Sequence, residues 1–136
     1  MVRILVVDDN PTVRQYLRAI LEQQSAWSVC GEARTGEEAL RRVEISTPDV
    51  VLLDFRMPDL NGLDVAREIA RQYPEIAILM VTVYLTVQLA AEAKAAGVRG
   101  VCAKSDIGSI VEAVEALLNK KTYFPAPPHD RIAIEP

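Results

Sequence analysis

Short apolar runs alternate with longer amphipathic stretches along most of the chain. The runs are rich in β-branched residues, which is typical of strands. They lack the apolar–polar alternation of a half-exposed sheet, as expected for strands covered on both faces. The runs occupy Ile4–Val7, Trp27–Cys30, Val50–Leu53, Ile76–Val81 and Gly100–Ala103. The pattern predicts five strands, each followed by a helix.

Capping residues indicate where the helices begin and end. Asn10 is expected to cap the first helix with Pro11 at its first position, and Thr35 with Glu38 forms a capping-box pattern before the second. The predicted ends of the second, third and fourth helices are marked by Pro48, Pro74 and Gly97. The fourth stretch is so rich in alanine that its apolar stripe is weak. The fifth has the clearest stripe, formed by Ile107, Ile110, Val111, Val114, Leu117 and Leu118.

The strand–helix alternation implies an α/β domain with a parallel sheet and helices on both faces. The chain has 136 residues, which is about the length of one domain, and its last helix is predicted to end near residue 120. Four of the eight prolines fall in the last twelve residues. We therefore predict a domain over 1–120 and a Pro-rich linker or C-terminal tail over 121–136, outside the core.

Composition excludes several classes of function. Fifteen basic against nineteen acidic residues give a net charge of −4, which disfavours direct binding to a nucleic-acid backbone. The only histidine is His129, so a histidine-based triad or metal site is not expected. No apolar run has the length of a signal peptide or a membrane span. Cys30 and Cys102 lie in apolar stretches and are predicted to be buried, reduced thiols of a cytoplasmic protein.

Polar side chains end four of the five apolar runs. Asp8 and Asp9 follow the first, Asp54 the third, Thr82 the fourth and Lys104 the fifth. The carboxyl ends of parallel strands share one edge of the sheet, where open α/β proteins bind ligands. For a strand order of 2-1-3-4-5, the strand order reverses between strands one and three, which carry the aspartates.

Each of these residues also has an ordinary explanation. Asp8 and Asp9 could belong to a capping turn and Asp54 to a loop turn, Thr82 could simply end a strand, and Lys104 could be solvated. Their coincidence at one edge favours a site. Three converging carboxylates repel one another unless a cation binds, and Mg²⁺ prefers such oxygen ligands. A carboxylate could then hold a phosphoryl group as an aspartyl phosphate, with lysine and threonine contacting its oxygens.

Four segments together resemble the receiver domain of two-component response regulators: Val6–Asp9, Leu53–Gly62, Val81–Thr82 and Ala103–Lys104. The resemblance covers residues 1 to about 120. It implies a flavodoxin-like, doubly wound (βα)5 sheet of order 2-1-3-4-5, with Asp54 as the phosphoacceptor and Thr82 and Lys104 in contact with the phosphoryl group. The implied Mg²⁺ ligands are Asp9 and Asp54 directly, Asp8 through water, and the backbone carbonyl of Arg56.

The resemblance also implies partners. The phosphoryl donor is a phosphohistidine on a sensor histidine kinase, and the chain is no enzyme beyond catalysing its own phosphorylation and dephosphorylation. Lys104–Asp106 and Lys121–Pro125 are similar to the NarL/FixJ class, which continues into a DNA-binding helix-turn-helix domain. We therefore expect transcriptional output through such a domain, absent from this chain, homodimerisation on phosphorylation, and no membrane partner. The alternatives are a stand-alone receiver and a non-phosphorylated receiver-fold interaction module.

Three positions depart from the family pattern. Ser105 replaces a frequent proline, which disfavours a cis peptide bond. Val101 replaces the usual switch aromatic, and Val83 replaces a smaller residue and is predicted to narrow access to Asp54. Arg56 and Tyr84 occupy variable positions that tune self-dephosphorylation in the family. Arg56 also disfavours a haloacid-dehalogenase-type phosphatase, which needs aspartate at that position. A nucleotide-binding module is disfavoured because the chain has no glycine-rich loop after the first strand to hold phosphates.

Overall fold

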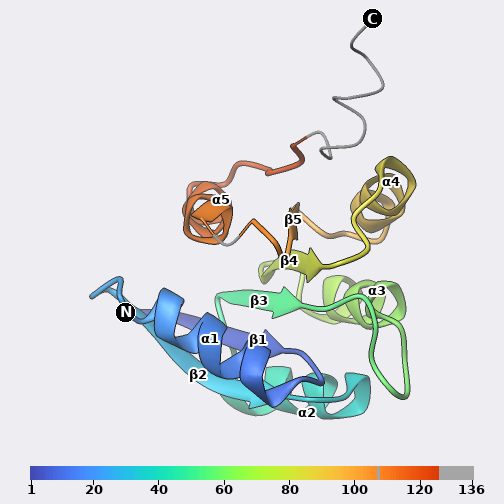
Figure 1. The fold of residues 1–136 in the computed structure, drawn as a ribbon. Coiled ribbons are helices and arrows are strands. Elements are labelled where there is room, and N and C mark those ends of the chain that lie inside the picture. Colours follow the sequence, from blue (N-terminus) through green and yellow to red (C-terminus); the bar gives the residue numbers. More distant parts are fainter. Residues whose placement is uncertain (107, 126–136) are drawn as a thin grey trace, which may run out of the picture.

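A computed structural model describes residues 1–106 and 108–125, in which strands and helices alternate (Figure 1). All the strands pair in parallel in one sheet of order β2-β1-β3-β4-β5, which confirms the flavodoxin-like topology. The elements are β1 (Val2–Val7), α1 (Pro11–Leu21), β2 (Trp27–Ala33), α2 (Gly36–Ser46), β3 (Val50–Leu53), α3 (Gly62–Gln72), β4 (Ala77–Thr82), α4 (Val87–Ala95), β5 (Gly100–Ala103) and α5 (Gly108–Leu118).

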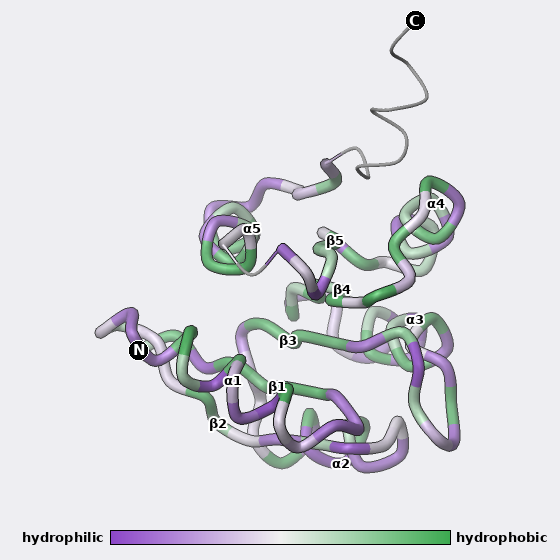
Figure 2. Tube along the Cα trace, viewed as in Figure 1, coloured by the Kyte–Doolittle hydropathy of each residue, from purple (hydrophilic) through white to green (hydrophobic). Residues whose placement is uncertain are grey.

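The helices cover the two faces of the sheet unequally. Helices α1 and α5 pack on one face, and α2, α3 and α4 pack on the other (Figure 1). Strands β3 and β4 are entirely buried, and β1 is buried from Ile4 to Val7, which explains the uninterrupted apolar runs there. In Figure 2 this apolar layer runs through the middle of the molecule, and the polar residues lie towards the outside.

The predicted helix caps are present. Asn10 Oδ1 accepts hydrogen bonds from the N–H groups of Thr12 and Val13, and Thr35 Oγ1 accepts one from Glu38 N–H (3.1 Å). Pro11 is the first residue of α1. After α4, Gly97 has a φ of 98°, and the N–H of the residue after it bonds back into the last turn, so glycine ends this helix as predicted.

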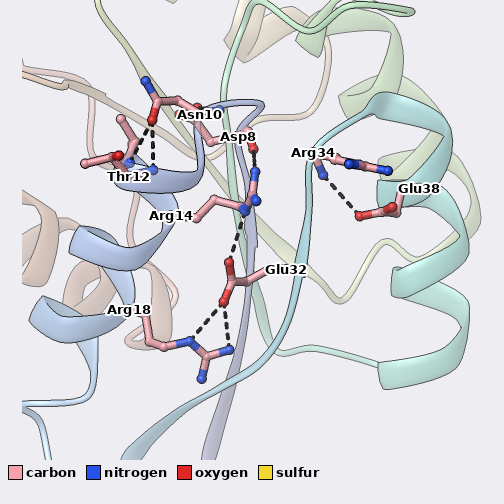
Figure 3. Close-up of polar contacts among 9 residues, drawn as sticks. Asp8, Asn10, Thr12, Arg14, Arg18, Glu32, Arg34 and Glu38 are labelled. Carbon is pink, nitrogen blue, oxygen red and sulfur yellow. Dashed lines mark hydrogen bonds and ion pairs between the residues drawn. The ribbon is translucent and has the colours of Figure 1, made fainter.

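Strand β2 is longer than its apolar run predicted. It continues beyond Cys30 to Ala33 because the pairing with β1 shifts by one residue at Cys30 and then resumes. The polar Glu32 is accommodated there because its carboxylate binds Arg14 and Arg18 (Figure 3). Similarly, β4 lies one residue further along the chain than predicted, so that Thr82 is within the strand.

The prediction for the thiols was correct for one cysteine and wrong for the other. Cys102 is buried in β5, and burial raises the pKa of its thiol to about 11. Cys30 is only half-buried, because it sits at the irregularity in the β1–β2 pairing. Both are free thiols.

The segment after α5 contacts the sheet. Tyr123 forms a parallel bridge with Gly100, and both Tyr123 and Phe124 pack against the core, although the sequence predicted this segment to lie outside it. The described residues do not include Ile107, which belongs to the apolar stripe predicted for the fifth helix. They also do not include residues 126–136, among them His129. Within the described part, no helix has the length and apolar character needed to cross a bilayer.

Candidate functional site

The strand ends bring the predicted residues together at one edge of the sheet. Asp8 follows β1, Asp54 follows β3, Thr82 ends β4 and Lys104 follows β5. Asp8, Asp54 and Thr82 are buried, with exposed fractions of 1%, 5% and 0%, whereas Asp9 is exposed. One carboxylate oxygen from each of the three aspartates lies within 4.8 Å of the others. The predicted acidic cluster is therefore present.

Asp8 is the most constrained of the three. Its Oδ1 accepts a hydrogen bond from Asn10 N–H (2.9 Å), and its Oδ2 lies 2.6 Å from Lys104 Nζ. Its backbone carbonyl accepts a further bond from Arg14 Nη1 (2.7 Å), which joins it to the Arg14–Glu32 pair (Figure 3). Because both carboxylate oxygens and the backbone carbonyl have partners, the side chain of Asp8 is held in one position at the edge of the site.

The negative charge of Asp54 is less well compensated than that of Asp8. Lys104 Nζ lies 3.1 Å from its Oδ2, further than from Asp8. Burial, and then the negative charge of Asp8, raise the pKa of the Asp54 carboxyl, with Lys104 opposing them. Burial disfavours the charge on Lys104, but the hydrogen bond to Asp8 and the charges of Asp54 and Asp8 outweigh it and raise the pKa of the ammonium. One lysine therefore does not fully offset two buried carboxylates.

These residues fit a hard divalent cation. Carboxylate oxygens are the ligands that Mg²⁺ prefers, and this ion keeps several waters, which the exposed side of Asp9 allows. Burial, and then the charge of Asp8, raise the pKa of the Asp54 carboxyl, and a bound cation would favour its charged form.

Asp54 faces an open cavity of about 420 Å³. Asp9, Arg56 and Lys104 line it together with Val83 and Tyr84 from the loop after β4. The Arg56 guanidinium lies over the Tyr84 ring, 4.3 Å from its centroid, so the two variable positions form a cation–π pair across the opening.

Thr82 joins the β4 and β5 ends of the site. Its backbone carbonyl accepts a hydrogen bond from Lys104 N–H (2.9 Å), and its hydroxyl accepts one from Tyr84 N–H (3.1 Å). The hydroxyl therefore holds the first turn of the loop that leads to α4. A group that turned this side chain away from Tyr84 N–H would release that loop.

Gly62 and Asp59 position the loop after Asp54, although the sequence analysis assigned no role to either. Gly62 donates a hydrogen bond to the carbonyl of Phe55 (2.7 Å), and a Cβ at this position would overlap the Asp54 carbonyl. Asp59 accepts hydrogen bonds from Gly36 N–H (2.8 Å) and Glu37 N–H (3.0 Å), so it ties the loop to the start of α2. No local pattern reveals these contacts, because one depends on how the loop after β3 folds back on itself and the other joins that loop to α2.

Residues 4–115 match the family model described as the response regulator receiver domain. The chain belongs to this family. Among curated relatives, the receiver domain is 35% identical over 125 residues to the response regulator UvrY of Escherichia coli (strain K12), and 33% identical over 125 residues to the response regulator GacA of Pseudomonas viridiflava. These alignments cover 91% of this chain but only 57% and 58% of those proteins.

A solved structure gives the same fold. This receiver domain is 32% identical, with a TM-score of 0.88, to a LuxR-family two-component response regulator from Aurantimonas sp. SI85-9A1, and the match covers 95% of this chain and 92% of that one. Among the departures from the family pattern, Val101 is fully buried in β5. No peptide bond in the described residues is cis, which agrees with serine at position 105.

Proposed function

We propose that Asp54 accepts a phosphoryl group from a phosphohistidine on a sensor histidine kinase, in a reaction that requires Mg²⁺. The observation that supports this most strongly is the position of Asp54. Its carboxylate is buried beside Asp8 and Lys104, yet it faces an open cavity through which a phosphoryl donor can approach. Membership of the receiver family agrees with this chemistry.

In the proposed reaction, an Asp54 carboxylate oxygen attacks phosphorus as the phosphorus–nitrogen bond to the donor histidine breaks. The electron pair of that bond stays on the imidazole, which takes up a proton. The Lys104 ammonium offsets charge on the phosphoryl oxygens, and the Thr82 hydroxyl donates a hydrogen bond to one of them. Asp9, Asp54 and the Arg56 carbonyl, with Asp8 through water, would hold the Mg²⁺, which would supply further positive charge.

The direct test is incubation of the protein with Mg²⁺ and acetyl phosphate, followed by intact-mass measurement. We expect a phosphoryl mass gain that is absent in Asp54→Asn and retained in Asp64→Asn, which alters an exposed carboxylate at the start of α3. A folded protein that binds Mg²⁺ without any mass gain would contradict the proposal. It would favour the alternative of an interaction module that is not phosphorylated.

Val83 is proposed to limit access to Asp54. Its side chain lines the cavity and is 64% exposed at the opening. Shortening it in Val83→Ala should therefore speed phosphorylation by acetyl phosphate, as followed by the rate of mass gain. An unchanged rate would show that this side chain does not obstruct the donor.

We also propose that this receiver works in a longer, cytoplasmic transcriptional regulator. It is 35% identical to UvrY but covers 57% of that protein's length. DNA would then be bound only by a helix-turn-helix domain beyond residue 136, and phosphorylation would promote homodimerisation through the face formed by α4, β5 and α5. Reading the gene past the codon for Pro136 tests this: a helix-turn-helix reading frame supports it, and an immediate stop codon contradicts it.

A further inference from the structure

Residues 122–125, here called the C-terminal clasp, extend the sheet beyond β5. Tyr123 N–H donates to the carbonyl of Arg99 (2.9 Å), and the carbonyl of Tyr123 accepts a bond from Val101 N–H (2.8 Å). Figure 1 shows the chain leaving α5 and running past β5 towards α4. Gly100 permits this approach, because a Cβ there would lie only 3.0 Å from the Tyr123 carbonyl oxygen. The clasp therefore pairs with the outer edge of the sheet.

The two aromatic residues of the clasp lie on opposite faces. Tyr123 packs with the cluster under α1 and α5, and Phe124 packs with the cluster under α2, α3 and α4. The Lys94 ammonium, in the second half of α4, lies 5.6 Å from the centroid of the Phe124 ring. Phe124 thus reaches the side of the sheet that α4 covers, from a segment outside the five strand–helix units.

Helix α4 has few other anchors. Its buried residues are Leu89 and Ala93, and three of its other seven residues are alanines. Little apolar area is therefore buried by the helix itself, and its position is weakly determined. In this setting the half-buried ring of Phe124, which lies next to the Lys94 ammonium, adds an anchor to the helix.

The start of α4 is connected to the phosphorylation site. The Thr82 hydroxyl accepts a hydrogen bond from Tyr84 N–H, and α4 begins three residues later at Val87. We infer that the Thr82 side chain rotates to donate to the phosphoryl group, which carries its oxygen away from Tyr84 N–H and removes a contact that holds the loop. A displacement of α4 would then move Lys94 away from the Phe124 ring and open that side of the cluster.

We propose that Phe124 is a positioning residue for α4, and that the clasp is seated in the unphosphorylated state and released when Asp54 is phosphorylated. This inference rests on the proposed function. Because the coupling is reciprocal, a clasp that stabilises only the unphosphorylated arrangement must oppose phosphorylation. The residues that follow 125 would then receive the signal through the clasp itself.

Hydrogen exchange of the full chain tests the release. Amide exchange at Val101 and Tyr123 is measured with Mg²⁺ alone and with Mg²⁺ plus beryllofluoride, which mimics an aspartyl phosphate. In parallel, intact-mass measurement after incubation with acetyl phosphate shows whether the protein is phosphorylated. We expect both amides to exchange about tenfold faster with beryllofluoride. If exchange is unchanged in a protein that acquires the phosphoryl mass, the proposed release of the clasp is wrong and the proposed function still stands. No phosphoryl mass gain would overturn both.

Variants test whether Phe124 acts on the site. Phe124→Ala should bind beryllofluoride about fivefold more tightly than the wild type, with unchanged affinity for Mg²⁺, and Phe124→Tyr should restore the wild-type affinity. Tyr73→Ala is the matched control, since it removes a half-buried aromatic side chain from the same core cluster beside α2. An equal change in both alanine variants, or none in Phe124→Ala, would overturn the proposal.

Discussion

Helices α3 and α4 cover the same face of the sheet, and each follows a strand that ends at the acidic site, but they are anchored very differently. Five residues of α3 are buried, including Leu63, Val65 and Ile69. Only Leu89 and Ala93 are buried in α4. Both helices have a side-chain N-cap, from Asn61 and Thr86, so the difference lies in packing and not in capping.

This difference divides the site into a fixed side and an adjustable side. The loop that carries Asp54 is held by α3 through Gly62 and by α2 through Asp59. The loop after Thr82 leads into a helix that buries little apolar area and so opens or shifts at lower cost. A phosphoacceptor benefits from a fixed carboxylate, and a conformational signal benefits from an adjustable neighbour.

The largest expected contrast is between core truncations in the two helices. Ile69→Ala should lower the free energy of unfolding by about 3–4 kcal/mol, because its side chain is buried at the centre of the α3 interface. Leu89→Ala should cost about 2 kcal/mol, since the weakly held α4 can adjust around the smaller side chain. Urea denaturation measures both. Equal losses would mean that α4 is packed as firmly as α3.

Gly62 tests the fixed side directly. Gly62→Ala should destabilise the protein by about 2–3 kcal/mol, because the added methyl would overlap the Asp54 backbone and also lie 2.9 Å from Phe55 Cα. Gly108→Ala is the control: its Cβ meets nothing within 4 Å, and alanine should stabilise α5 by up to about 1 kcal/mol. A tolerated Gly62→Ala would show that the loop carrying Asp54 can shift.

The charge on the fixed side gives a pH-dependent prediction. Burial and then the charge of Asp8 raise the pKa of Asp54 in the folded state, so its ionisation weakens folding in Mg²⁺-free solution. Asp54→Asn should therefore melt a few degrees higher than the wild type near pH 7. This difference should be absent below the pKa of an unfolded aspartate, about 3.9, and grow as the pH rises through the folded-state pKa. Thermal melts at several pH values decide this, and a lower melting temperature for the variant at neutral pH would be contrary to expectation.

The smallest expected effects come from the two N-caps. Asn61→Ala should lower global stability by about 1 kcal/mol, because α3 unfolds together with the core. Thr86→Ala should mainly speed hydrogen exchange within α4, with a smaller change in global stability. Comparing denaturation with residue-level exchange separates the two. Equal global losses would place α4 in the same cooperative unit as α3.

Much of the architecture could be predicted from local pattern. The caps at Asn10 and Thr35, the stop at Gly97 and the five apolar runs depend on residues close together in sequence, and the structure contains them all. The extension of β2 was missed, because Glu32 is tolerated in a strand only when Arg14 and Arg18 approach from α1. The strand order came from the resemblance to a family, since alternation alone does not specify it.

The sequence by itself determined the elements, the edge at which Asp8, Asp54, Thr82 and Lys104 meet, and the family, because periodicity, capping and short motifs are local properties. Only the tertiary structure decided that Lys104 lies closer to Asp8 than to Asp54 and that Phe124 packs against the face covered by α4. Those contacts join segments far apart in the chain. They depend on the register of the strands and on how much apolar surface each helix buries, which no local pattern contains.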